Sequence, residues 1–447
     1  MRRQGIQIAI AVVLVVTAAS LAFTGCSGVG PTGNETTKIK IALTLPEIPG
    51  YFGGSISEGG SRYYERAVET VTEGRIDIEI YTSEILCKQN LAYDAVAEGI
   101  ADIAWAVATY VPQWVPLETV FFIGVDMDSC EQTYWVHNRI YKEHLQPLYE
   151  ERGLIYVTTL GREKLIVFSA RDRIDTMEDF TGLTIMSGGK EMEQLISKLG
   201  AMTITVEFQD VYEALQKGAL DAAMLDITVP LLLRWYEAGD PGYIIDCGGI
   251  GMAEATYIAN EDLLTKLRPE DTYALLKLTD YWYGIQGSQG SDRSNLLYWG
   301  EVPKVGMELI DWPESEKEKL RVLKREVYDW WIDWMEADFG LGEEAEAILE
   351  AVLEEMENYE PGNKCVSNPA GYRDKDYDGQ AEEWVQQLRD AGWTVDEESW
   401  QEVVGPDGHW GMDFVYEDDF DPWWEKWWDE QNMEHPWYEN WKAQHGK

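Results

Sequence analysis

Hydrophobic and polar residues alternate along several short segments of the chain, and segments with a helical period separate them. Residues 76–81 read Ile-Asp-Ile-Glu-Ile-Tyr, the strict alternation of a half-buried strand. Such patterns predict strands at 38–45, 76–81, 101–106, 154–160, 165–169, 183–186, 203–206 and 222–225. The helices predicted between them are 62–73, 90–99, 190–199 and 209–217. Strands that alternate with helices of this length are typical of parallel α/β units.

The alternation occurs once before residue 150 and again after it, which predicts two α/β lobes with a cleft between them. Lobe 1 is expected over residues 38–160 and is completed by about residues 250–290. Lobe 2 is expected over residues 161–249 and is completed by about residues 291–340. Two longer helical patterns are expected to brace the lobes, at 270–283 and 314–336.

The N-terminus has the pattern of an export signal. Basic residues at positions 2 and 3 precede an apolar stretch that is long enough for a signal peptide but short for a membrane span. Small residues then lead to Cys26, as in a bacterial lipobox. We therefore expect a lipoprotein signal peptide at 1–25, lipidation of Cys26, and a flexible Gly/Ser-rich tether at 26–37. An uncleaved N-terminal anchor is the alternative, and both place the rest of the chain outside the cytoplasm.

The charge balance is strongly acidic, with 81 Asp and Glu against 36 Lys and Arg and a formal net charge of −45. Such a surface repels nucleic-acid phosphates and anionic lipid headgroups, so nucleic acid is not an expected partner. Two explanations remain open: an adaptation to solubility or high salt, and a field that attracts cations.

Residues 341–447 are predicted to be an acidic, tryptophan-rich C-terminal extension. The segment Asp421-Pro-Trp-Trp-Glu-Lys-Trp-Trp428 places indoles four residues apart on one helical face. Two interpretations are open. The helix docks its aromatic face onto the lobes, since tryptophan buries much apolar area, or it forms a surface for a partner.

The residues that usually carry catalysis or hold zinc do not form recognisable motifs. The four cysteines after Cys26, at 87, 130, 247 and 365, permit two disulfides in an exported chain and lack the spacing of a zinc site. The five histidines form no His-Glu-x-x-His pattern, and there is no nucleophile elbow or Walker loop. We therefore expect a protein that is not an enzyme and needs no cofactor.

One segment of the C-terminal extension begins like a calcium loop. Asp374, Asp376 and Asp378 alternate before Gly379, an arrangement that can wrap oxygen ligands around a hard cation. The twelfth position, where a calcium loop has a bidentate Glu, is Val385. A calcium site and a solvated acidic turn are therefore both open interpretations.

A series of segments in residues 38–335 resembles the solute-binding proteins of tripartite ATP-independent periplasmic (TRAP) transporters, the DctP type. The segments that carry the resemblance are Gly74-Arg-Ile-Asp-Ile-Glu-Ile-Tyr, Tyr93-Asp-Ala-Val-Ala-Glu-Gly-Ile-Ala-Asp-Ile103, Tyr110-Val-Pro-Gln-Trp-Val-Pro-Leu117, Met177-Glu-Asp-Phe-Thr-Gly-Leu-Thr-Ile185 and Asp210-Val-Tyr-Glu-Ala-Leu-Gln-Lys-Gly-Ala-Leu-Asp221. The resemblance implies a two-lobe periplasmic-binding-protein fold that closes on a solute by a hinge motion, and permease subunits as partners.

The resemblance also implies where the ligand lies. In Gly182-Leu-Thr-Ile-Met186 a methionine stands where the family holds a substrate carboxylate with arginine, and Arg162 and Lys164 lie near the place of a second family arginine. The ligand-lining residues that the resemblance implies are Trp105, Val107, Tyr110, Arg162, Met186, Phe208, Leu225 and Asp226. These would make a mostly apolar and aromatic cavity with one carboxylate. We therefore predict a neutral, aromatic or cationic solute, held by Asp226 or by an aromatic face.

The functional prediction is an extracytoplasmic solute-binding lipoprotein that serves a TRAP-type secondary transporter. The alternative is a ligand-sensing or scaffolding surface lipoprotein that binds a partner through its tryptophan-rich tail.

Overall fold

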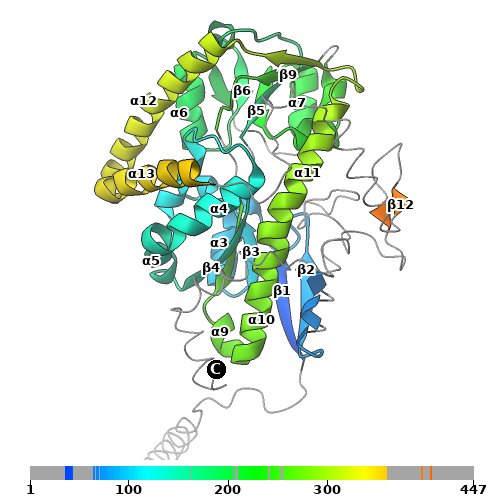
Figure 1. Cartoon of the computed structure of the whole chain (residues 1–447), viewed down its shortest axis with the longest axis vertical. Helices are drawn as coiled ribbons and strands as arrows, with labels where there is room; N and C mark the ends of the chain where they lie inside the picture. Colours follow the sequence, from blue (N-terminus) through cyan, green and yellow to red (C-terminus); the bar gives the residue numbers. More distant parts are fainter. Residues whose placement is uncertain are drawn as a thin grey trace, which may run out of the picture.

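In the computed structural model, most of the described residues form two α/β lobes, one below the other in Figure 1. The residues described are 36–43, 64–65, 67–69, 71–162, 164–204, 206, 210–239, 242–251, 255–359, 394–395 and 403–404. The predicted signal peptide, Cys26, residues 26–35 of the tether, Phe208, the calcium loop at Asp374, Asp376 and Asp378, and the tryptophan-rich segment at 421–428 lie outside them.

Lobe 1 is built on a five-stranded sheet in the order β2-β1-β3-β10-β4. Its strands are β1 (Thr37–Ala42), β2 (Ile76–Tyr81), β3 (Ile103–Ala106), β4 (Leu154–Leu160) and β10 (Ala255–Asn260). Strand β1 pairs in parallel with β2 and β3, as the sequence pattern predicted. Strand β10, which the sequence pattern did not predict, runs antiparallel to both β3 and β4, so the sheet is mixed.

Lobe 2 is built on a six-stranded sheet in the order β11-β9-β5-β8-β6-β7. Its strands are β5 (Ile166–Ser169), β6 (Thr184–Met186), β7 (Met202–Ile204), β8 (Ala222–Leu225), β9 (Tyr243–Asp246) and β11 (Glu308–Asp311). Strand β5 is antiparallel to both of its neighbours, β8 and β9. Each lobe therefore contains one strand that breaks the parallel pattern.

The antiparallel strands are the places where the chain enters one lobe from the other. Strand β5 follows directly from β4 of lobe 1, and β10 follows from β9 of lobe 2. The chain enters the new lobe on the side that faces the other lobe, and the neighbouring strands have their carboxyl ends on that same side. A strand that begins there must therefore run antiparallel to them. The crossing connections, described at residues 161–162, 164–165 and 247–251, therefore form the hinge region.

A long helical run makes a further crossing. Helix α10 (Pro269–Thr279), the π-helical turn η8 (Asp280–Ile285) and α11 (Gln286–Glu301) follow one another and extend from the lower lobe to the upper one (Figure 1). The sequence predicted only 270–283, because glycines beyond it weaken the helical signal. Those glycines permit close packing: a Cβ at Gly284 would lie 2.2 Å from Thr158 Oγ1, and one at Gly287 would lie 2.9 Å from Leu160 Cδ1.

The other helices cover the faces of the sheets. The α-helices are α3 (Ala92–Ala97), α4 (Cys130–Ile140), α5 (Gln146–Glu150), α6 (Lys190–Lys198), α7 (Val211–Lys217), α8 (Thr228–Leu232), α9 (Leu263–Lys266), α12 (Glu314–Phe339) and α13 (Gly342–Asn358). The short turns that matter for the site are η2 (Ala108–Tyr110) and η3 (Pro116–Phe122). Within the described part of the chain, no helix is both long enough and apolar enough to cross a bilayer.

Helix α13 lies in the segment assigned by composition to the C-terminal extension, yet it packs against the lobes. It contacts α12, α4 and η3, and it lies across lobe 1 in Figure 1. Its buried residues are Ala345, Ile348, Leu349 and Val352, the spacing of one helical face. Glutamates surround that face, so the helical spacing of the apolar residues was not recognised within a generally acidic region.

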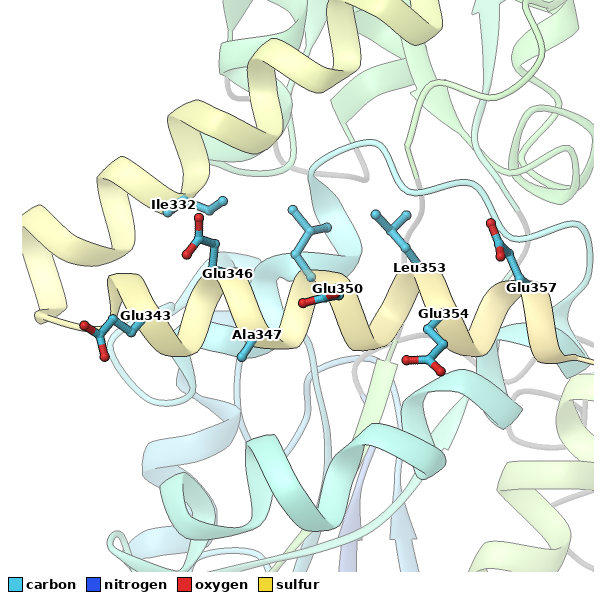
Figure 2. Close-up of a pocket in the computed structure, with 9 residues that line it drawn as sticks. Ile332, Glu343, Glu346, Ala347, Glu350, Leu353, Glu354 and Glu357 are labelled. Carbon is cyan, nitrogen blue, oxygen red and sulfur yellow. The ribbon is translucent and has the colours of Figure 1, made fainter.

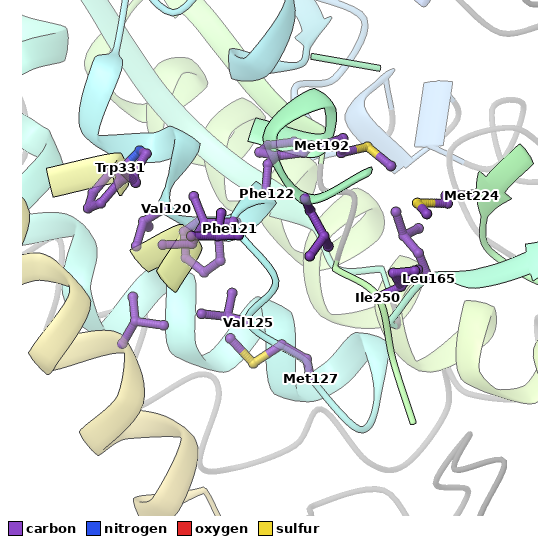
Figure 3. Close-up of a cluster of buried hydrophobic side chains, with 14 of the residues drawn as sticks. Val120, Phe121, Phe122, Val125, Met127, Leu165, Met192, Met224, Ile250 and Trp331 are labelled. Carbon is purple, nitrogen blue, oxygen red and sulfur yellow. The ribbon is translucent and has the colours of Figure 1, made fainter. Parts of the chain in front are cut away.

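An apolar core continues from lobe 1 into lobe 2. Figure 3 shows part of it, where Phe121 and Phe122 of η3 lie near Met192 of α6 and Trp331 of α12. The indole nitrogen of Trp331 donates a hydrogen bond to Thr119 Oγ1 at 2.8 Å. Helix α12 also contacts α6 and α13, so it braces both lobes as the sequence predicted for this helix.

Candidate functional site

The carboxyl ends of strands from both sheets face the region between the lobes. Strand β3 ends at Ala106 and leads into η2, while β6 ends at Met186 and β8 ends at Leu225. Strand β8 lies beside β5, which enters lobe 2 from the hinge, so its carboxyl end lies on the hinge side. Ligands in such sheets bind outside the carboxyl ends of the strands, which makes this region the candidate site.

One hydrogen bond joins the two lobes directly at this region. Thr109 in η2 donates from Oγ1 to Glu191 Oε2 at 2.7 Å, and Glu191 is the second residue of α6 in lobe 2. The loop before α6 fits closely against Thr109, because a Cβ at Gly189 would lie 1.8 Å from Thr109 Oγ1. The lobes are therefore closed on each other in this structure.

Glu191 is a buried carboxyl group. The side chain is 0% exposed, and among the described residues Oε1 has no partner within hydrogen-bond distance. Burial raises the pKa of Glu191 to about 7, against the smaller lowering effects of the hydroxyls of Thr109 and Thr119 and of the Lys190 charge. The sequence did not single out Glu191, since an acidic residue in the first turn of a helix is ordinary.

Two of the predicted site residues form an ion pair. The guanidinium of Arg162, in the hinge segment after β4, contacts Asp226 Oδ2 just beyond β8. Their side chains are 11% and 7% exposed. Asp226 Oδ1 accepts a hydrogen bond from the Thr228 backbone N–H at 3.0 Å. Both oxygens of Asp226 are therefore engaged, and this carboxylate holds the guanidinium in place.

The other predicted lining residues differ in exposure. Tyr110 is 50% exposed, and its hydroxyl lies 4.0 Å from where a Cβ of Gly188 would be. Val107 and Met186 are half-buried at the ends of their strands. Leu225 is buried in the lobe 2 core. Trp105 is also buried and belongs to the core cluster of Ile41 and Tyr257, so its place argues against contact with a solute.

Lysines and aspartates surround the hinge segments. Lys164 Nζ lies 3.2 Å from Asp128 Oδ1, and Lys324 of α12 pairs with Asp126. Burial lowers the pKa of Lys164, but the carboxylates of Asp128, Asp126 and Asp246 outweigh that effect and raise it. Lys164, expected near the ligand, therefore contributes to the hinge. These contacts connect the η3 loop, the hinge and α12, and the sequence offers no spacing that would have revealed them.

A buried polar cluster lies inside lobe 1, centred on Glu118 and His137. His137 Nε2 lies 3.1 Å from Glu118 Oε1, and His137 Nδ1 lies 3.1 Å from the Tyr156 hydroxyl. Thr256 and Tyr149 also donate to the Glu118 carboxylate. Burial raises the pKa of Glu118, but the hydrogen bonds from His137, Thr256 and Tyr149 outweigh it, and the pKa is lowered. The cluster joins η3, α4, β4 and β10.

A groove of about 720 Å³ runs along α13 beside Ile332 of α12 (Figure 2). Glutamates of α13 line it together with a few apolar side chains: Ile332, Glu343, Glu346, Ala347, Leu349, Glu350, Leu353, Glu354 and Glu357. Its negative charge disfavours anions. Over the described residues, no cluster of histidine, cysteine and carboxylate side chains has the geometry of a metal site.

The cysteines do not form the two disulfides that their number permitted. Cys87 and Cys247 are thiols, and Cys130 Sγ accepts a hydrogen bond from Asn295 Nδ2 at 3.6 Å. Burial raises the pKa of the Cys247 thiol to about 12, which makes it unreactive. Cys365 lies outside the described residues.

Comparison with known sequences identifies a family and individual relatives that match a large part of the two lobes. The family model of bacterial extracellular solute-binding protein, family 7, matches residues 54–333. A solute-binding protein of Albidiferax ferrireducens is 26% identical over 208 residues, which cover 45% of this chain and 60% of the relative. The C4-dicarboxylate-binding periplasmic protein DctP of Rhodobacter capsulatus is 26% identical over 233 residues, covering 51% of this chain and 68% of the relative. The matches thus span about two thirds of these relatives' length or less.

Comparison with solved structures finds the same fold along nearly the whole length of other proteins. A marine metagenome TRAP solute-binding protein specific for aromatic acid ligands, in complex with 3-hydroxybenzoate, has a TM-score of 0.65 at 16% identity and covers 73% of this chain and 100% of its own. A TRAP solute-binding protein of Rhodoferax ferrireducens with copurified benzoate has a TM-score of 0.62 at 18% identity, covering 72% and 98%. DctP7 of Bordetella pertussis, which binds pyroglutamic acid, has a TM-score of 0.61 at 16% identity, covering 70% and 100%.

Proposed function

Because the chain belongs to family 7 of the bacterial extracellular solute-binding proteins, the DctP type of TRAP transporters, we propose that it captures one small organic solute between its lobes and delivers it to a membrane permease. The relatives are binding proteins rather than enzymes. The observation that carries the proposal is the closed contact between the lobes at the strand ends, where Thr109 of lobe 1 meets Glu191 of lobe 2. Opening and closing of this contact would admit and enclose a solute.

The solute proposed is neutral, aromatic or cationic. Met186 stands where the family resemblance places a carboxylate-binding arginine, and a thioether cannot form that charge-assisted contact. Arg162 is neutralised by Asp226, whose oxygens are both engaged, so neither charge is open to a solute without rearrangement. The half-exposed Tyr110 is then the aromatic side chain proposed to contact the solute. The solved relatives that bind 3-hydroxybenzoate and benzoate support an aromatic ring in the solute.

A thermal-shift screen tests the solute class. The compounds are benzoate and pyroglutamate as carboxylates, benzamide as a neutral aromatic amide, and benzylamine as an aromatic cation. Benzamide or benzylamine should raise the melting temperature, because a ligand that binds the folded state stabilises it. A screen in which only the carboxylates raise it would refute the proposed class. Mass spectrometry of molecules that copurify with the protein would identify the natural solute directly.

Tyr110→Ala is expected to weaken binding of the best compound from that screen about tenfold, or about 1.4 kcal/mol, because the variant loses an aromatic face. Stability should change by less than ~0.5 kcal/mol, since an exposed side chain contributes little to the core. Titration calorimetry and urea unfolding measure the two effects. Met202→Ala, at an equally exposed residue at the start of β7, is the matched control and should leave affinity unchanged. Equal affinities of Tyr110→Ala and wild type would remove Tyr110 from the site.

The proposal includes attachment to the membrane by lipid on Cys26. The apolar N-terminal stretch followed by small residues and Cys26 supports it. The Cys26→Ala variant should move from the membrane fraction to the soluble extracytoplasmic fraction. Retention of this variant in the membrane would favour an uncleaved N-terminal anchor instead.

The tryptophan-rich tail supports a second candidate function, a sensing or scaffolding lipoprotein that binds a partner through this segment. Four indoles within Asp421-Pro-Trp-Trp-Glu-Lys-Trp-Trp428 are an unusual concentration of the residue that dominates protein interfaces. Removal of residues 384–447 should abolish partner capture under this alternative and leave solute uptake intact under the transport proposal.

Calcium titration before and after Asp376→Ala tests the candidate loop at Asp374, Asp376 and Asp378 in the same region.

A further inference from the structure

Glu191 occupies a position where closing of the lobes changes its surroundings completely. Its hydrogen-bond partner Thr109 belongs to the other lobe, and the side chain is 0% exposed in the closed structure. Separating the lobes removes Thr109 and returns the carboxyl group to water. In the closed state the carboxyl group of Glu191 is therefore removed from solvent, whereas in the open state it is hydrated.

Among the described residues, the buried carboxyl group forms no ion pair. The nearest basic side chain in sequence, Lys190, points to α12: its ammonium lies 3.3 Å from Asp338 and 4.3 Å from the Trp334 ring centroid. Lys198 at the other end of α6 pairs with Glu326 of α12 at 2.7 Å. On the lobe 1 side, Glu118 of η3 is held by His137. The charge of Lys190 lowers the pKa of Glu191, but less than burial raises it.

The neighbours that do reach Glu191 are small and polar. Thr109 donates to Oε2, the Thr119 hydroxyl is the other side chain that lowers the pKa, and among the described residues Oε1 has no partner within hydrogen-bond distance and no solvent. The dipole of α6 favours a negative charge in its first turn. The cost of removing an isolated carboxylate from water exceeds that effect, so the neutral acid is the favoured form when the lobes close.

We infer that Glu191 is a proton-operated latch, which takes up one proton as the lobes close on a solute and releases it as they open. The inference rests on the proposed solute-binding function and names how that site is regulated. Protonation converts the carboxylate to a neutral acid that the closed contact accepts. Capture is then coupled to proton uptake, and delivery of the solute returns the proton to the medium.

The sign of the pH dependence follows from linkage. The closed state has the raised pKa of about 7, and an exposed glutamate in the open state has the ordinary value of 4.5. Closure is therefore fully favoured below pH 4.5, weakens as pH rises, and loses this contribution above about pH 7. Solute affinity should fall by up to about tenfold per pH unit between these values.

Infrared difference spectroscopy of the full-length protein, with saturating benzamide present to close the lobes, tests the proton directly. Wild type minus Glu191→Gln should show the C=O stretch of a protonated carboxylic acid that disappears as pH rises through about 7. Glu193→Gln, an exposed glutamate two residues along the same helix, is the matched control and should leave that band unchanged. Absence of the band at pH 5 in wild type with benzamide bound would overturn the inference.

Closure itself is measured by pulsed spin-label distances between residues 85 and 202, which are exposed positions in lobe 1 and lobe 2. Labels introduced there as an unnatural amino acid should show a shorter distance at pH 5 than at pH 8.5 in wild type, and a short distance at both in Glu191→Gln. Benzamide, which does not titrate in this range, should bind Glu191→Gln at least tenfold more tightly than wild type at pH 8.

The outcomes separate the latch from solute binding. If benzamide binds and closes both proteins equally at every pH, the latch is wrong and solute capture stands. If no compound of the screen closes the lobes of either protein, the proposed function fails.

Discussion

His137→Phe is expected to lower the free energy of unfolding by about 3–5 kcal/mol, because it leaves the Glu118 carboxylate buried without its principal partner. The phenyl ring preserves the stacking on Phe121 and Tyr156, whose ring centroids lie 5.0 and 4.9 Å from that of His137. Packing is therefore nearly unchanged, and the loss reports the hydrogen bonds. Urea unfolding followed by circular dichroism measures it.

The half-buried His144 supplies the control for this substitution. His144→Phe adds the same ring outside the Glu118 cluster and should change stability by less than ~1 kcal/mol. A second check uses pH. Because the folded-state pKa of Glu118 is lowered, its contribution is full above the ordinary value of 4.5 and is lost as pH falls through the folded value. Glu118→Gln should lose that part of the acid dependence. A His137→Phe protein as stable as wild type would show that the cluster contributes little.

Gly189→Ala is expected to weaken solute binding by about 5–150-fold, the equivalent of an overpacking cost of about 1–3 kcal/mol. The new methyl group would lie 1.8 Å from Thr109 Oγ1, so the lobes cannot reach the closed position without displacement. The backbone of Gly189 is extended, with φ 178°, so alanine introduces no backbone strain. Stability of the open form should therefore be preserved. Titration calorimetry with the best compound of the screen measures the change.

The adjacent Gly188 is the matched control. A Cβ there meets Met192 Sδ at 3.6 Å, an ordinary van der Waals contact, so Gly188→Ala should bind nearly as wild type. Thr109→Gly in the Gly189→Ala background removes the obstructing side chain and should restore part of the affinity. If Gly189→Ala binds as tightly as wild type, closure does not bring η2 against α6.

The regular elements were predictable where a single periodicity dominates. Strands β2, β4 and β8 have the bounds that alternation or a short apolar run predicted. The strands beyond residue 225 were not predicted from the pattern. Strand β9 contributes only a short apolar pair, Ile244 and Ile245, next to Gly and Pro, and such runs do not distinguish strand from loop. The antiparallel direction of β5 and β10 depends on which lobe the chain comes from.

The candidate site was predictable only in part, because its contacts join distant segments. Arg162 and Asp226 were both expected at the site, but their pairing across 64 residues is a property of the fold. Glu191 was missed for the same reason. Thr109 lies 82 residues before it, and neither residue belongs to a motif. Burial and the lack of a partner within hydrogen-bond distance of Oε1 distinguish Glu191 from the other described glutamates, and both require coordinates.

Each sheet contains strands from separate parts of the sequence, and this arrangement sets the order in which the two lobes can be assembled during synthesis. The sheet of lobe 1 needs β10 between β3 and β4, and the sheet of lobe 2 needs β11 beside β9. A ribosome must therefore deliver residue 260 before the first sheet can close, and residue 311 before the second can. Pairings this distant form slowly. The nascent chain thus remains without a finished domain for most of its translation, which is the condition that threading through a narrow secretion channel demands.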